Sequence, residues 1–270
     1  MIRLLELEWL KNKNNLPFWI LLGLYGATMY VACSLGTVLM NITFEMTTSG
    51  DIPPQIPDFN IYNYPDIWHN LAYLASFVKV FLGIIVISAI SNEISQKTLR
   101  QNIIDGLSRI EFLGSKFLTV LILSIASTLL LLGLTTYFGM TYGETVDYDT
   151  NEKVDFILGH FIQILTFLSF CMFIGMLIKS TGLAIVFMLV WSLFLETFIF
   201  WIIFGFENSV SQYMPIHVIN DLVQIPFSIL NPDNVQTSVS YESITLGLAW
   251  TILFFLLSLV KINRGNIYEY

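Results

Sequence analysis

Long apolar stretches alternate with shorter polar intervals along the whole chain. Several of these stretches reach the roughly 20 residues that an α-helix needs to cross the hydrocarbon core of a bilayer. Their positions predict six transmembrane helices, at about 16–39, 70–91, 117–141, 156–178, 183–204 and 243–260. No repeat or linker divides the pattern, so the expected fold is an all-α membrane protein with one domain over residues 1–270.

The composition agrees with a membrane location. Apolar residues make up 55% of the chain and charged residues 12%, with a mean hydropathy of +0.71. A soluble domain carries about twice that charged fraction. The two cysteines, Cys33 and Cys171, both fall inside apolar stretches, so we interpret them as small core residues and expect no disulfide and no metal or cofactor site.

The first fifteen residues mix leucines with both kinds of charge. In this segment Trp9 is flanked by Glu8 and Lys11, a pattern typical of an amphipathic helix that lies in the membrane interface with its tryptophan at headgroup depth. The alternative is a short soluble helix. The expected element at 1–15 is the interfacial helix.

Lysine and arginine are distributed unequally between the two sides of a six-span arrangement, which places both termini on one side. Outer segments hold only Lys153, whereas they hold thirteen acidic residues, and Lys79 lies inside a span. Basic residues are retained on the cytoplasmic side, so both termini are expected to be cytoplasmic. The other ten basic residues are then inside: Arg3, Lys11, Lys13, Lys97, Arg100, Arg109, Lys116, Lys179, Lys261 and Arg264.

The segment 205–241 is apolar enough to contact lipid, but Pro215 and Pro226 interrupt it. It is too short to cross the bilayer twice. We expect one or two short helices that dip into the outer leaflet, where protein must satisfy the backbone groups. A helical hairpin lying above the membrane is the alternative.

The longest polar interval on the predicted cytoplasmic side is 91–116, between the second and third spans. Apolar residues recur through it at intervals that indicate one or two short amphipathic helices, interrupted near Gly106. Such a surface favours a docking partner over a passive turn.

Two charges lie inside predicted spans. Lys79 is about nine residues from the outer end of its span and Glu196 about eight from the outer end of another, which places both at roughly 12–14 Å depth. A charge at this depth costs at least about 2.5–3.5 kcal/mol. Equal depth and opposite sign predict an intramembrane ion pair between the second and fifth spans, within one protomer or across protomers, with either a transport role or a structural role.

No catalytic motif is present. The sequence has no GxxxxGK[ST] loop for ATP, no HExxH and no GxSxG. The three histidines, His69, His160 and His217, are far apart at or near span ends, which suits interfacial polar residues. The net charge of −8 is sorted by side and does not indicate a nucleic-acid partner. We therefore do not expect the chain itself to be an enzyme.

The 91–116 stretch resembles the permease subunits of type-2 ABC transporters. That family carries in this loop a Glu, a Gly-Thr-Leu step, a Pro-hydrophobic-Ser-Arg element and a Lys that enters the third span. Glu93, Thr98-Leu99, Ser108-Arg109 and Lys116 match those positions. The departures are Lys97 where Gly is usual and Asp105-Gly106-Leu107 where Pro is common.

The resemblance implies a dimer, with an identical or homologous second protomer, on two separate ATPase subunits that bind ATP and Mg. It also implies a coupling helix within 91–116 and a location in the inner membrane of a prokaryote. The residues expected to dock on the ATPase are Glu93, Lys97, Leu99, Arg100, Ile103, Asp105, Leu107 and Arg109.

Three other functions stay open. The chain could be a non-transporting scaffold of an envelope or secretion assembly, with outer loops that bind a partner. A secondary transporter coupled through Lys79 and Glu196 would usually need discontinuous helices. An intramembrane enzyme would need a nucleophile and base set that the spans do not show.

Overall fold

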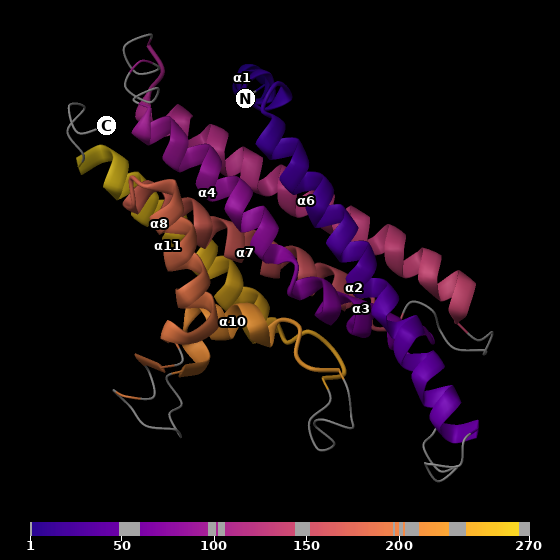
Figure 1. Ribbon diagram of the computed structural model, residues 1–270. Helices are drawn as coiled ribbons and strands as arrows, with labels where there is room; N and C mark the ends of the chain where they lie inside the picture. The colour runs from indigo at the N-terminus through magenta and orange to yellow at the C-terminus, as the bar shows by residue number, and fades with distance from the viewer. Residues whose placement is uncertain are drawn as a thin grey trace.

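The computed structural model is helical throughout the residues it describes and has no strand among them. These residues are 2–48, 60–96, 101, 106–143, 152–196, 198–199, 202, 211–226 and 236–264. Figure 1 shows long helices lying side by side, with the two chain ends at the same end of the molecule. The all-α prediction is confirmed for this part of the chain.

The helices follow the order of the predicted elements. The N-terminal half forms α1 (Ile2–Lys13), α2 (Leu16–Thr48), α3 (Ile67–Ser76), α4 (Lys79–Ser95) and α6 (Arg109–Tyr142). The C-terminal half forms α7 (Asp155–Leu177), α8 (Thr181–Val190), the π-helical turn η1 (Trp191–Leu195), the 3-10 turn η2 (Ser211–Tyr213), α10 (Pro215–Asp221) and α11 (Tyr241–Arg264).

α7 is the central helix of the bundle. In its most apolar window 83% of the residues are buried, against 17–28% for α2, α6 and α11. Helices α11, α4 and α6 pack most extensively against it. The approach of α4 depends on Gly83, because a Cβ at that position would lie 2.8 Å from Met188 Sδ and 2.9 Å from Cys171 Sγ.

The outer helices expose large apolar side chains. Val31 on α2, Leu129 on α6 and Ile252 on α11 are all more than half exposed. Continuous apolar surface of this kind is not stable in water and indicates contact with lipid. Length and composition allow four described helices to cross a membrane: Leu16–Val38 within α2, α6, α7 and α11.

A fifth crossing is formed if α3 and α4, which meet at a 43° bend, count as one broken span. Over the predicted span 183–204, α8 and η1 together cover Thr181–Leu195, and the described residues beyond them at 196, 198–199 and 202 are also helical. The multi-pass prediction is therefore confirmed at four or five spans in the described residues, and the sixth stays a prediction.

Contacts identify which elements meet at each end of the bundle. At one end, α1 and α11 both contact the first turns of α6, and Thr181 at the start of α8 donates to Asn92 on α4 (2.9 Å). At the opposite end, Lys153 pairs with Asp66, and Asp155 accepts from the backbone N–H of Val239 (2.6 Å). We call these the α1 end and the Lys153 end.

α10 is inserted between the long helices. Gln163, eight residues into α7, donates through Nε2 to the carbonyl of Ile219 (2.8 Å). At 1.5 Å per residue this contact is about 12 Å along α7 from its start at the Lys153 end. α10 therefore packs among the long helices, and its position relative to the outer leaflet stays a prediction.

Candidate functional site

The described part of the 91–116 stretch ends in a well-defined helix start. Gly106 has φ +96°, a backbone conformation that favours glycine, so the interruption lies where the sequence predicts it. Ser108 then begins α6 with a capping box: its Oγ accepts from the N–H of Glu111, and the Glu111 carboxylate accepts from the N–H of Ser108 (2.8 Å). This start fixes the direction in which the chain enters α6.

Three of the predicted docking residues are described, and each has contacts within the chain. Glu93 is half-buried and pairs with lysines, and Leu107 packs against the core. Arg109 donates from Nη1 to the carbonyls of Ile262 (2.8 Å) and Asn263 (2.7 Å), which joins α6 to the last turn of α11. The other five lie outside the described residues: Lys97, Leu99, Arg100, Ile103 and Asp105.

Four charged residues meet at the α1 end and form what we call the charged cluster: Glu8, Lys11, Glu93 and Lys116. Lys116 Nζ lies 2.8 Å from Glu8 Oε1 and 2.6 Å from Glu93 Oε1, and only 2% of its side chain is exposed. Lys11 Nζ lies 3.3 Å from Glu93 Oε1. The cluster is neutral overall and joins α1, α4 and α6.

The sequence identified two of these four residues through the family pattern, Glu93 and Lys116, but did not pair them. Glu8 was not recognised as a partner, because it lies more than a hundred positions before Lys116 in the chain. A signal was available for Lys116, which is a charge at the start of an apolar span and therefore needs a counter-charge. Glu8 gave no such signal, because Lys11 lies one turn farther along α1.

The predicted ion pair between Lys79 and Glu196 is not formed within the chain, and a pair across protomers stays a prediction. Lys79 Nζ instead donates to Asn220 Oδ1 at 3.4 Å and lies 5.5 Å from the centre of the Phe167 ring. The Glu196 carboxylate accepts from the backbone N–H groups of Ile216 (2.8 Å) and His217 (3.1 Å). It also accepts from Trp191 Nε1 (3.2 Å).

The physical reason is that α10 lies between the two charges. The first turn of a helix has N–H groups without intrahelical partners. These N–H groups can donate to a carboxylate and so stabilise its charge in place of a cation. Glu196 therefore contacts the N-terminal turn of α10, and Lys79 contacts Asn220 near its C-terminal end. The two signs match the polarity of the helix dipole.

The π-helical turn η1 directs Glu196 inward. The N–H of Glu196 donates to the carbonyl of Trp191, one residue farther back than in an α-helix. Leu193 and Phe194 within this turn are 63% and 68% exposed, whereas Glu196 is 2% exposed. Because of the wider turn, the side chains of Leu193 and Phe194 face lipid while the Glu196 carboxylate, two to three residues later, is buried.

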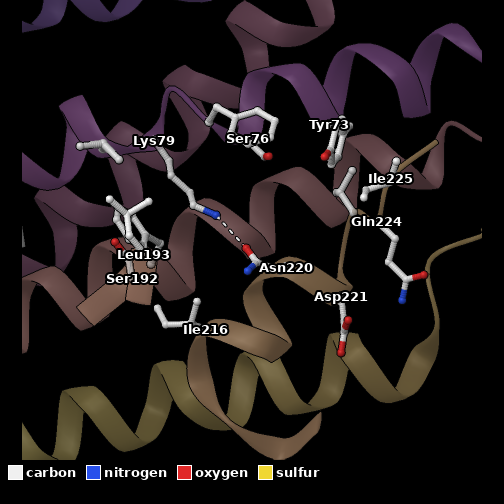
Figure 2. A pocket seen from close by; sticks show the side chains of 14 residues that line it. Tyr73, Ser76, Lys79, Ser192, Leu193, Ile216, Asn220, Asp221, Gln224 and Ile225 are labelled. Carbon is white, nitrogen blue, oxygen red and sulfur yellow. Dashed lines mark hydrogen bonds between the residues drawn. The ribbon is translucent and has the colours of Figure 1, made fainter. Parts of the chain in front are cut away.

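A cavity of about 470 Å³ lies beside this arrangement, between the α3–α4 bend, η1 and α10. Figure 2 shows Lys79 reaching toward Asn220, while the Asp221 carboxylate is directed away from the ammonium group. Ser76 and Ser192 add hydroxyl groups to the lining. Within the described residues, no group of three or more His, Cys, Asp or Glu side chains could hold a metal ion.

Comparison with known proteins bears on the whole arrangement. A family model described as "ABC-2 family transporter protein" matches residues 37–260, which include the 91–116 stretch, both intramembrane charges and α10. No individually curated protein matches the chain. The match extends over well more than half of the sequence and confirms the resemblance drawn from the 91–116 residues, so this chain belongs to the ABC-2 family of transporter proteins and is a membrane permease component of an ABC transporter.

Proposed function

We propose that the chain dimerises and docks on separate ATPase subunits through residues 91–116, so that ATP hydrolysis there moves a substrate across or out of the membrane. ATP and Mg bind to the partner ATPase in this proposal. The observation that carries it is the family match over 37–260, because membrane components of this family are not ATPases themselves.

The arrangement of charge supports a cytoplasmic α1 end. Lys11, Lys116 and Arg109 make their contacts there, and α11 ends there with Lys261 and Arg264 in its last turn. The Lys153 end has Lys153 alone among the described basic residues outside the spans. Positive residues are retained on the cytoplasmic side, so the 91–116 stretch would face the ATPase. In a prokaryote this is the inner membrane.

The charged cluster would couple the docking stretch, residues 91–116, to the helices of the bundle. The stretch follows the last turn of α4, which contains Glu93, and it includes the first two turns of α6 up to Lys116. These two residues form an ion pair of 2.6 Å. A displacement of the stretch would therefore move α4 and α6 together. Glu8 would carry the same displacement to α1.

The test is co-purification of an ATPase subunit. The tagged full-length chain is extracted from its native membrane in mild detergent, and bound proteins are assayed for ATP hydrolysis. The informative variant is the double charge reversal Lys97→Glu with Arg100→Glu, which should abolish co-purification. Arg109 is unsuitable, because its reversal would also release α11.

Lys153→Glu is the matched control, since it reverses a basic charge at the opposite end. It should leave ATPase recovery unchanged. Recovery of envelope proteins without any ATPase would support the scaffold instead and would refute the permease mechanism. Equal loss of the ATPase in the double reversal and in Lys153→Glu would refute docking through 91–116.

A further inference from the structure

The cavity beside α10 combines one cation with apolar walls. Phe77, Val80, Phe167 and Leu193 contribute apolar surface, and Lys79 contributes the positive charge. Phe77 and Leu193 are also 64% and 63% exposed on the outer surface of the bundle. The cavity therefore borders the surface that faces lipid, and a molecule dissolved in the bilayer can reach it from the side.

Lys79 is incompletely neutralised by its surroundings. Its ammonium group has three donors, and the hydrogen bond to Asn220 is long at 3.4 Å with a neutral acceptor. The Phe167 ring adds a weak cation–π contact at 5.5 Å. Within the part of the chain that the structure describes, no carboxylate lies within ion-pair distance of Lys79 Nζ.

The nearest acidic groups are satisfied or oriented elsewhere. Glu196 uses both carboxylate oxygens on donors around α10 and on Trp191. Asp221 lines the cavity, but Figure 2 shows its carboxylate directed away from the ammonium group. The Lys79 ammonium group therefore has N–H donors that lie beside an apolar cavity at the lipid-facing surface.

We propose that this cavity binds the anionic head of an amphiphile that enters from the bilayer, with Lys79 as the anion-binding residue and the apolar walls in contact with its chain. Ser76 adds a hydroxyl group to the same cavity, whereas the Ser192 hydroxyl already donates to the carbonyl of Leu189 (3.2 Å). The inference deepens the proposed permease function, and it rests on that function only where it concerns transport of the amphiphile.

The chemistry selects an anion with an apolar tail. A charge-assisted hydrogen bond is about twice as strong as a neutral one, and the low dielectric of the cavity adds to this difference. A cationic amphiphile would be repelled by Lys79, and a neutral one could accept a hydrogen bond but would leave the ammonium charge without a counter-charge. Carboxylates and phosphate esters share the required chemistry.

Binding is measured on the purified full-length chain in a neutral maltoside detergent, with radiolabelled laurate as the probe. Laurate and dodecyl phosphate should compete for the site, whereas dodecanol and dodecyltrimethylammonium, which have the same chain, should not. Equal competition by all four compounds would mean partition into apolar surface and would overturn the proposal.

Two variants test the role of Lys79. Lys79→Met should weaken laurate binding by about 10- to 100-fold, the value of a hydrogen bond to a charged group. Asn220→Asp places a carboxylate where Lys79 already donates, so it should raise thermal stability and still abolish laurate binding. Because this second variant keeps Lys79 and supplies its counter-charge, loss of binding there cannot be attributed to unfolding.

Lys13→Met is the matched control, because Lys13 is an exposed lysine on α1, at the opposite end from the cavity. It should bind laurate like the unmodified chain. Unchanged binding in both Lys79→Met and Asn220→Asp would overturn the assignment.

The bound anion could be a transported substrate or a lipid that stays with the protein. Reconstitution with the partner ATPase in liposomes distinguishes the two. ATP-dependent release of bound laurate identifies a transported amphiphile, and ATP-independent retention identifies a lipid that stays with the protein. Both results are consistent with the site. Because binding is measured on the chain alone, failure to recover an ATPase would refute the proposed function without affecting the binding result.

Discussion

Replacement of Lys116 by methionine should be among the most destabilising single changes at the α1 end. Lys116 is nearly fully buried, and it contacts both Glu8 and Glu93 within 2.9 Å. Removing one partner of a buried ion pair costs about 3–5 kcal/mol, because the remaining charge is left without compensation. Lys11 still lies near Glu93 but not near Glu8, so we expect a cost within this range.

The assay is thermal unfolding in detergent, followed by size-exclusion chromatography of the heated samples. For a chain of this size each kcal/mol corresponds to roughly 2–4 °C, so Lys116→Met should lower Tm by about 6–20 °C. The matched control is Lys153→Met. Its ion pair with Asp66 has the same 2.6 Å length, but the Asp66 side chain is 62% exposed, and exposed pairs contribute only about 0–1 kcal/mol.

A further variant separates charge imbalance from lost packing. The triple change Glu8→Gln, Glu93→Gln and Lys116→Met removes all three charges, so no carboxylate is left buried alone, and it should recover most of the stability lost in Lys116→Met. If Lys116→Met and Lys153→Met lower Tm by the same small amount, burial does not strengthen this cluster and the reasoning is wrong.

Three further predictions concern helix contacts. Gly83→Leu should destabilise the bundle by about 1–3 kcal/mol through overpacking, whereas Gly26→Leu, where a Cβ would meet nothing within 4 Å, should be nearly neutral in the same unfolding assay. Glu196→Leu should speed hydrogen exchange of the first α10 amides, and unchanged protection would mean that the carboxylate does not hold that helix. Arg109→Met should increase proteolysis near the C-terminal end of α11, and cleavage at the rate of the unmodified chain would contradict a structural role for its two carbonyl contacts.

The sequence predicted the long helices well, because apolar length is a local property. The span expected at 156–178 is α7, Asp155–Leu177. The helix that begins at Leu16 continues to Thr48, beyond the predicted end at 39. Hydropathy reports where a helix leaves lipid, whereas a helix ends only where a cap or a breaker stops it, and residues 40–48 contain neither Pro nor Gly.

The bend between α3 and α4 could not be predicted locally, since residues 76–79 contain no Pro or Gly. The importance of Lys79 and Glu196 could be predicted, because any charge inside a span is costly. Their partners could not. Lys79 contacts the neutral amide of Asn220, and Glu196 contacts mainly backbone N–H groups of α10. Neither kind of partner is charged, so neither can be recognised in a sequence as a counter-charge.

Polar contacts hold α10 at three places along its length, and these contacts differ in strength. Its N-terminal turn is held by two backbone hydrogen bonds to Glu196, whereas near its other end a single long contact joins it to Lys79. Between these two ends, Gln163 of α7 donates to the carbonyl of Ile219 at 2.8 Å, so the contact to Lys79 is the longest and weakest of the three. The short helix is therefore attached more firmly to α7 and to the segment with Glu196 than to α4, and the wall of the cavity between α4 and α10 has the weakest polar link.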